Sequence, residues 1–357
     1  MNLRLLDGKR RFVFPILVLI VVRFLCGLLL YTSLKPSNWL NLFSRWDSGH
    51  YLVIAGGWYP PSVSPVWAFF PLYPAAIRLV GWIIPDITLA AFVVSTISGL
   101  AAMVMFQLVA EHYAAKRSAM QSALIYFLLP PVFVFSMVNY SESLFLLLAL
   151  LTWKLHLQER DFAASLAASL TALTKTDGLI IILPLAYDYL KSREFSKLAL
   201  LAVPALAVVG WVIYGEIMTG TLIPFSGWHF WRTENMLLIR KTLNELLMGN
   251  TVNLYRFTPY ANVAVASLAF LILFALVARE VWKVDRALFL YVCVSAIGVL
   301  GVGSIVAFRS VPRLLAFLFP LGLPLYFRER KVTYAIILTL VALDYIAWFA
   351  FLTDGFY

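Results

Sequence analysis

The chain has 357 residues, of which 62% are hydrophobic and only 13% are charged, and its net charge is +10. Soluble globular domains carry about 25% charged residues, so this composition, with a mean hydropathy of +0.87, excludes that class and indicates an integral membrane protein. The charge does not indicate nucleic-acid binding, because the basic residues form short clusters between apolar runs.

The first apolar run covers residues 12–34 and follows a basic cluster that ends at Arg11. It is long enough to cross a membrane, and no small-residue cleavage site follows it, so we predict a retained span rather than a signal peptide. The cysteines, Cys26 and Cys293, lie within apolar runs and do not indicate a disulfide framework.

Apolar runs that could cross a membrane recur along the chain, and we expect about eleven spans, with a range of roughly 10–12. They cover residues 12–34, 88–110, 119–138, 141–157, 162–174, 178–190, 198–217, 259–279, 286–308, 313–327 and 332–353. The prediction is an all-α polytopic membrane protein whose residues 1–357 form a single integral membrane domain.

Basic residues of the short connections predict the orientation in the membrane. When the N-terminus is placed in the cytoplasm, most of them, such as Lys116, Lys191 and Arg328, fall on the cytoplasmic side. The two long connections, residues 35–87 and 218–258, are then extracytoplasmic.

Both long loops have features of the membrane–water interface. The loop 35–87 is rich in tryptophan and other aromatic residues, which favour this interface. Its segment Ala68–Ile84 is apolar, but its prolines and Arg78 favour an interfacial helix over a span. In the loop 218–258, the pattern of residues 234–248 predicts an amphipathic helix.

The first cluster of reactive side chains runs from Arg45 to Tyr51, with Trp46 beside the acid. If this segment is helical, Asp47, His50 and Tyr51 share one face. A carboxylate there could serve as a general base, worth about 10²–10⁴ in rate, and the histidine could orient it. In the alternative interpretation, Asp47 only caps a short helix and His50 bonds to a loop.

Two further extracytoplasmic turns carry charged residues. Glu142 could bind an acceptor hydroxyl or a basic side chain, or it could be a first-turn acid of the following helix. Lys175 is an isolated external cation followed by Asp177, which suggests a phosphate site, whereas the alternative is a solvated turn.

A pair of arginines, Arg309 and Arg313, lies between two late apolar runs. The planar guanidinium suits phosphate, although interfacial snorkelling would also explain the pair. Arg23 is an ionisable residue within the first span and has no evident partner in the sequence. The chain has no DxD pair and no Gly-rich nucleotide motif, so metal-dependent nucleotide-sugar chemistry is not supported.

Several of these segments resemble the PIG-V-like mannosyltransferases, a family that contains the second mannosyltransferase of glycosylphosphatidylinositol assembly and its prokaryotic relatives. The similarity begins with Arg45-Trp46-Asp47, His50-Tyr51 and Ala68-Phe69-Phe70-Pro71-Leu72-Tyr73-Pro74. Tyr140–Phe145 matches the next stretch of the family, and weaker similarities follow in the same order at Leu173–Gly178 and Arg313–Leu321. The third stretch has Lys175 where the family usually has arginine, and the chain is short for the eukaryotic enzyme, which suggests a prokaryotic member.

The resemblance implies a GT-C fold in which the first external loop, residues 35–87, supplies the catalytic acid at Asp47. It also implies a polyprenyl-phosphate sugar donor, in this family dolichyl-phosphate mannose, and inversion at the anomeric carbon. The active site is then expected on the outer face of a prokaryotic plasma membrane, or in the lumen of the endoplasmic reticulum if the protein is eukaryotic.

We therefore expect an inverting glycosyltransferase that moves mannose or a similar hexose to a hydroxyl of a lipid-linked or glycan acceptor. Asp47 accepts the proton, His50 positions Asp47 or the acceptor, and Lys175, Arg309 and Arg313 bind the donor phosphate. The residues expected at the acceptor or sugar are Arg45, Trp46, Tyr51, Tyr73, Glu142, Asp177 and His229.

The expected partners are the donor, the acceptor and membrane lipids, without nucleic acid. No cofactor is required, and a divalent metal is compatible with the chemistry but lacks a DxD motif. Two alternatives stay open: a transporter or flippase for a lipid-linked anion, and a non-catalytic subunit of a glycosylation complex. The lack of a clear internal repeat disfavours the transporter, and Asp47 disfavours the subunit.

Overall fold

The computed structural model describes residues 10–222, 270–301, 305–327 and 329–353, and within these ranges the chain is helical and contains no strand. The elements of the first half are α1 (Arg10–Leu34), η2 (Trp39–Phe43), α2 (Ser48–Gly57), η3 (Pro65–Ala68), α3 (Leu72–Gly81), α4 (Ile87–Tyr113), α5 (Lys116–Phe127), α6 (Pro130–Phe135) and α7 (Glu142–Leu157). The later elements are α8 (Asp161–Ala172), η4 (Thr176–Ile181), α9 (Ile182–Lys191), η5 (Phe195–Leu201), α10 (Ala202–Thr219), α13 (Arg286–Gly301), α14 (Ile305–Ala316), η6 (Phe319–Gly322) and α15 (Arg330–Leu352). The predicted all-α class is confirmed for these ranges.

Fewer helices are long enough to cross a membrane than the sequence suggested. In the described part of the chain, 4 helices have the necessary length and hydropathy, namely Arg11–Leu34, Ile87–Tyr113, Phe195–Thr219 and Lys331–Leu352. The expected count of about eleven is therefore not confirmed. The run 119–138 illustrates the reason: α5 ends at Phe127 and α6 starts at Pro130, where proline lacks the N–H that a continuous helix needs.

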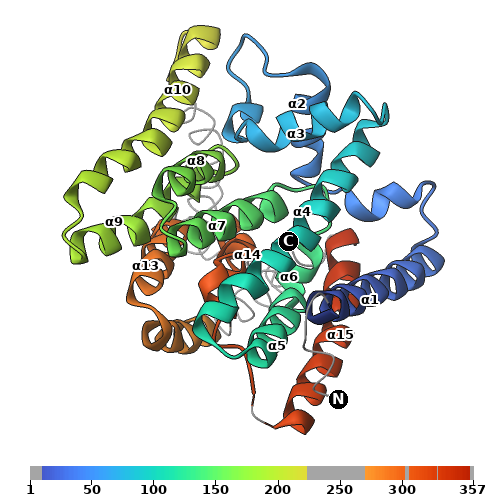
Figure 1. The fold of residues 1–357 in the computed structure, drawn as a ribbon. Coiled ribbons are helices and arrows are strands. Elements are labelled where there is room, and N and C mark those ends of the chain that lie inside the picture. Colours follow the sequence, from blue (N-terminus) through green and yellow to red (C-terminus); the bar gives the residue numbers. More distant parts are fainter. Residues whose placement is uncertain (1–9, 223–269, 302–304, 328, 354–357) are drawn as a thin grey trace, which may run out of the picture.

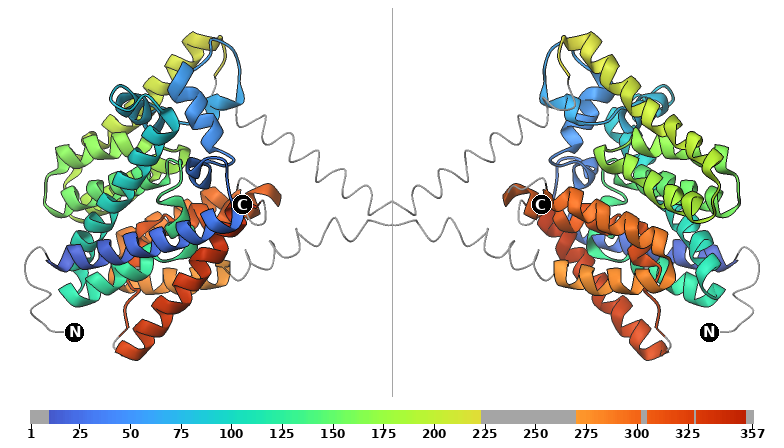
Figure 2. Two further views of the ribbon diagram at one scale, coloured as in Figure 1. Left: turned by 90° about the vertical axis from the view of Figure 1, so that its right-hand side faces the viewer. Right: turned by 90° about the vertical axis from the view of Figure 1, so that its left-hand side faces the viewer.

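The helices form one bundle around α4 (Figures 1 and 2). Helix α4 packs on α5 and α7, α7 packs on α8, and α8 packs on α10. On the other side α1 contacts α5 and α15, and α15 contacts α6. Large side chains such as Phe106, Tyr126 and Trp153 are fully buried between these helices, so the core is continuous across the bundle.

The first long loop gathers at one end of the bundle, beside the C-terminal part of α10 (top of Figure 1). Trp211 of α10 packs against Tyr59 and Trp67, with ring centroids 4.7 and 5.4 Å apart. The predicted interfacial segment Ala68–Ile84 forms α3, preceded by the short η3. The amphipathic helix expected at 234–248 lies outside the described residues.

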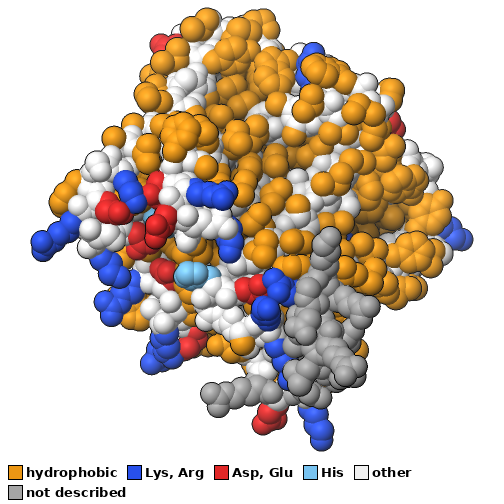
Figure 3. Space-filling model, viewed as in Figure 1, with side chains coloured by type: hydrophobic (Ala, Val, Ile, Leu, Met, Phe, Trp, Pro, Cys, Tyr) orange, Lys and Arg blue, Asp and Glu red, His pale blue; other side chains and the backbone are white. Residues whose placement is uncertain are grey.

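Charged side chains gather at another end of the molecule, at the lower left of Figure 3, whereas apolar side chains cover most of the upper and right parts of this face. An ion-pair cluster ties α7, α8, α9 and η5 together. His156 lies 3.3 Å from Asp161 and 3.2 Å from Asp188, and Lys197 lies 2.7 Å from Asp161. The bundle thus has a charged end that is distinct from the aromatic end formed by the first loop.

Candidate active site

A sharp turn between η2 and α2 presents Asp47. Trp46 has a φ of 51°, in the left-handed region that costs an L-residue about 1–2 kcal/mol. The Tyr140 hydroxyl holds the turn from both sides: it accepts from the Asp47 N–H at 3.2 Å and donates to the Arg45 carbonyl at 3.1 Å. Asp47 occupies the N-cap position of α2, but its side chain makes no capping hydrogen bond. The carboxylate is therefore free of the helix end and pairs elsewhere.

The partner of Asp47 is Arg313, from the other end of the chain. Nη1 of Arg313 donates to Oδ2 of Asp47 at 2.9 Å. Nε of the same guanidinium lies 3.5 Å from Oε1 of Glu142, a close charge contact without hydrogen-bond geometry. The Arg313 guanidinium also lies 5.2 Å from the ring centroid of Tyr140 and 5.4 Å from that of Phe135. Two rings and two carboxylates thus fix one cation beside Asp47.

Glu142 connects this arginine to a second cation. It begins α7, and Lys175 Nζ lies 3.4 Å from its Oε1. The Glu142 side chain is 3% exposed and that of Lys175 is 10% exposed, whereas that of Asp47 is 32% exposed. A buried charge is tolerated only when it is paired, and Glu142 satisfies this condition through two cations. Asp47 is the carboxylate that a substrate can reach.

These charged groups line one cavity of about 410 Å³, within the usual range for small-molecule sites. Its other walls are aromatic and aliphatic, from the first loop, η4, α13 and α14. The lining residues are Asp47, Tyr51, Ala68, Phe69, Phe70, Glu142, Thr174, Lys175, Asp177, Ile180, Gly298, Val299, Arg313 and Leu314. Glu142 Oε2 and Arg313 Nε are buried and find no hydrogen-bond partner among the described residues.

Two tyrosines support the cavity as neutral groups. The Tyr51 hydroxyl lies 2.8 Å from Ser141 Oγ. Burial raises the pKa of Tyr51 well above its usual value, and the negative charge of Glu142 raises it further. Burial and Asp47 do the same to the pKa of Tyr140, although Arg313 opposes the shift. Both phenols therefore stay protonated at neutral pH, so the groups here that can accept a proton are the carboxylates.

The structure brings together six of the residues singled out in the sequence: Asp47, Tyr51, Glu142, Lys175, Asp177 and Arg313 all line the same cavity. They were predicted from four separate segments, and the fold unites them from the first loop, α7, the α8–η4 connection with η4, and α14.

Other predicted site residues lie beside the cavity. Arg45 donates to the Leu352 carbonyl at 2.6 Å and so fastens the first loop to α15. The His50 ring stacks on Phe69 with centroids 4.7 Å apart. Tyr73 is fully buried, with its hydroxyl 2.6 Å from Ser95 Oγ.

The last three predicted site residues are Trp46, Arg309 and His229, and only the side chain of Trp46 is described. Trp46 is 48% exposed at the turn, next to the cavity. Arg309 lies on α14, but its side chain is not among those described. His229 lies outside the described residues.

The sequence analysis assigned no role in the site to Tyr140, whose hydroxyl holds the Asp47 turn, or to Phe69 and Phe70 of the cavity wall. Tyr140 immediately precedes the Ser141-Glu142 turn, and Phe69 and Phe70 stand before Pro71 in the aromatic stretch of the first loop. The available signal was that all three lie in the stretches that resemble the family. Groups of three or more His, Cys, Asp or Glu residues with a metal-binding arrangement do not occur in the described ranges.

One comparison with known proteins identifies the family. The family profile described as Mannosyltransferase (PIG-V) matches residues 30–223, more than half of the chain. A search of curated proteins finds no match. Among solved structures, a similar chain is the Archaeoglobus fulgidus oligosaccharyltransferase in complex with zinc and sulfate, with 15% identity and a TM-score of 0.49 over 97% of this chain. The present chain covers 52% of that protein. On the strength of the profile match, the chain belongs to the PIG-V mannosyltransferase family.

Proposed function

We propose that the protein transfers mannose, with inversion, from a polyprenyl-phosphate mannose donor to a hydroxyl of a lipid-linked or glycan acceptor, within a GT-C fold. The observation that carries this proposal is the cavity in which a substrate-accessible carboxylate, Asp47, lies beside two fixed cations, Lys175 and Arg313. A sugar phosphodiester and a hydroxyl nucleophile need these complementary groups. The family supplies the expectation that the sugar is mannose.

In the proposed reaction, Asp47 accepts the proton of the acceptor hydroxyl while the acceptor oxygen attacks the anomeric carbon. The bond between this carbon and the phosphate oxygen breaks, and the lipid phosphate leaves with the electron pair. A phosphate is a good leaving group, so no general acid is needed. Glu142 is the less suitable base, because its side chain is 3% exposed and lies between two cations. His50, one turn after Asp47, would position Asp47 or the acceptor.

The cations would stabilise the negative charge that develops on the phosphate. Arg313 is shared: its Nη1 holds Asp47, whereas its Nε has no hydrogen-bond partner among the described residues. A phosphate bound to Arg313 and Lys175 would compete with Asp47 for the guanidinium. Donor binding would therefore release the carboxylate toward the acceptor, so that the base becomes available only when the donor is present.

The proposed site faces away from the cytoplasm. The basic residues of the short connections are expected on the cytoplasmic side, and Lys154, Lys191 and Lys197 belong to the elements of the charged end. The first loop, which carries Asp47, gathers at the aromatic end. No cofactor is needed for this chemistry, and a chelator tests whether a divalent metal contributes.

The test is release of radiolabelled mannose from polyprenyl-phosphate mannose by purified protein in lipid, with crude membrane lipids as acceptor. Asp47→Asn should abolish turnover while donor binding persists. Asp86→Asn is the matched control: it lies in the same loop but caps α4 through the Thr88 and Leu89 N–H groups, at 2.8 and 3.0 Å. Wild-type protein that turns over no such donor would refute the proposal and favour a transporter or an accessory subunit.

A further inference from the structure

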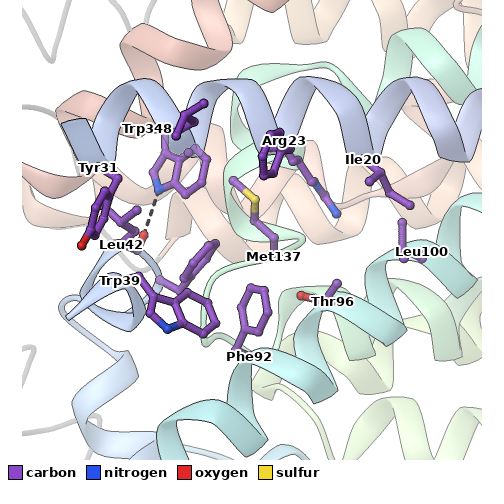
Figure 4. A pocket seen from close by; sticks show the side chains of 14 residues that line it. Ile20, Arg23, Tyr31, Trp39, Leu42, Phe92, Thr96, Leu100, Met137 and Trp348 are labelled. Atoms are coloured by element: carbon purple, nitrogen blue, oxygen red, sulfur yellow. Dashed lines mark hydrogen bonds between the residues drawn. The ribbon is translucent and has the colours of Figure 1, made fainter. Parts of the chain in front are cut away.

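A polar cavity of about 430 Å³ lies at the charged end of the bundle, where α9 ends and α13 begins. The side chains that line it are Tyr187, Asp188, Lys191, Trp282, Lys283, Val284, Asp285, Arg286 and Ala287, and five of them are charged. A cavity between α1, η2, α4 and α15 is different: its described lining is apolar and aromatic and has one charged side chain, that of Arg23 (Figure 4). The cavity at the charged end is therefore the better candidate for a charged ligand outside the candidate active site.

Both carboxylates of this cavity are already engaged by the protein. Asp285 Oδ1 accepts hydrogen bonds from two N–H groups in the first turn of α13, at 2.8 and 3.1 Å. Its Oδ2 accepts from the Tyr113 hydroxyl at 2.9 Å. Oδ2 of Asp188 lies 3.2 Å from Nε2 of His156. These acids hold helix ends together, so they oppose an anion in the cavity less than two free carboxylates would.

Two of the three cations in the lining, in contrast, pair with no carboxylate among the described residues. Lys283 forms an ion pair within its own helix. The Arg286 guanidinium lies 5.1 Å from the ring centroid of Trp282, and Lys191 Nζ lies 6.0 Å from that of Tyr187. A ring holds a guanidinium by its face, so the N–H groups at the edge stay available for oxygen atoms. An anion that enters the cavity thus meets two cations that are held in place by aromatic rings.

The cavity lies at the level where the neighbouring helices change from apolar to charged. In the helical segment 270–284, the exposed residues are apolar up to Leu276 and charged from Arg279 onward, apart from Trp282. In α13 the charged residue, Arg286, comes first and exposed apolar residues follow. Tryptophan and basic residues at the end of an apolar helix are typical of the head-group region of a bilayer. The two free cations are therefore placed where lipid phosphates lie.

We propose that this cavity binds the phosphate of an anionic membrane phospholipid through Lys191 and Arg286, with the acyl chains along the exposed apolar part of the segment 270–284. Basic pockets between helices at the cytoplasmic side of a membrane recognise such head groups. The Tyr187 hydroxyl and the Trp282 indole N–H also line the cavity and are neutral donors for the same phosphate. The site shares no residue with the candidate active site, so this inference does not depend on the proposed transferase function.

Native mass spectrometry of the purified full-length protein, titrated in detergent with phosphatidylglycerol or phosphatidylcholine, tests the proposal. The wild type should bind one phosphatidylglycerol more tightly than phosphatidylcholine. Lys191→Gln and Arg286→Gln should each weaken phosphatidylglycerol binding about fivefold, and the double variant about 30-fold, whereas Lys191→Arg should bind as the wild type does. The control is Lys116→Gln with Arg117→Gln, which removes the same charge from α5 without touching the cavity.

Two further measurements separate a lipid from a soluble phosphate and locate the acyl chains. Glycerol phosphate, the soluble head group, should displace phosphatidylglycerol only at a large excess; equal affinities would show a site for soluble phosphates and overturn the lipid assignment. Phosphatidylglycerol with a diazirine on one acyl chain should form adducts with the segment 270–284 that disappear in the double variant. Equal binding of the two lipids by the wild type, or unchanged phosphatidylglycerol binding by the folded double variant, would refute the proposal.

Discussion

Arg313 provides the sharpest test of the site, because one guanidinium touches two carboxylates. Its Nη1 lies 2.9 Å from Asp47 Oδ2, and its Nε lies 3.5 Å from Glu142 Oε1. Lysine carries a compact point charge on a flexible stem, so it can approach one carboxylate at a time. Arg313→Lys therefore keeps the net charge of the cavity and removes the bridge.

The expected loss follows from the geometry. A hydrogen bond to a charged group contributes about 1.5–3 kcal/mol. The Asp47 side chain is 32% exposed, so solvent screens its part of the contact, and we take the lower part of that range, about 1.5–2 kcal/mol. This corresponds to a loss of about 10- to 30-fold in kcat/KM. Arg313→Ala also removes one of two cations from the buried Glu142, which should cost about 3–5 kcal/mol of folding stability.

The assay is mannose transfer from radiolabelled polyprenyl-phosphate mannose, with kcat and KM measured separately and thermal unfolding followed in detergent. Arg313→Lys should raise the donor KM and lower kcat while unfolding stays close to wild type. Arg78→Lys is the control, because Arg78 lies on α3 near the Trp58 ring and does not line the cavity. Unchanged kcat/KM in Arg313→Lys, or an unchanged donor KM in a folded Arg313→Ala protein, would refute a role in phosphate binding.

Three further changes have expected outcomes. Tyr140→Phe removes the hydroxyl that holds Asp47 in its turn but keeps the ring under the guanidinium, so kcat should fall about tenfold with little change in Tm; an unchanged kcat would contradict this role of the hydroxyl. Gly178→Ala would place a Cβ 2.2 Å from the Thr171 carbonyl, so the free energy of unfolding should fall by about 1–3 kcal/mol, and an unchanged Tm would show that the turn adapts. Burial opposes ionisation of Asp161, but hydrogen bonds from its lysine and tyrosine partners hold its pKa below the usual value. Asp161→Asn should therefore destabilise the protein by about 1–2 kcal/mol at pH 7, and the difference in Tm from wild type should shrink as the pH falls below about 4. A difference in Tm that does not change with pH would show that the negative charge of Asp161 does not stabilise the protein.

The sequence predicted the charged residues of the site but not how they pair. Asp47, Glu142 and Lys175 stand in short polar turns between apolar runs, where a charge is conspicuous. Their partnership could not be predicted, because contacts such as that of Asp47 with Arg313 depend on how distant helices pack. Tyr73 illustrates the limit: an aromatic residue in an interfacial loop could meet a sugar, yet it is buried against Ser95.

The all-α class followed from composition, whereas the number of spans did not. Hydropathy averages over a window and does not register where a helix ends. The breaks before Pro130 and between η4 and α9 depend on local backbone geometry, and they convert runs that are apolar enough to span into shorter helices. Such helices are buried against protein, so an apolar sequence indicates contact with neighbouring helices as well as contact with lipid.

The separation between Asp47 and Arg313 along the chain, 266 residues, has a consequence for biogenesis. During translation the first loop is complete long before α14 is made, and until then Asp47 has no arginine beside it and Glu142 lacks one of its two cations. A nascent or truncated chain that ends before α14 would carry Asp47, Glu142 and Lys175 without Arg313. The charged cavity can therefore be completed only after α14 has been made.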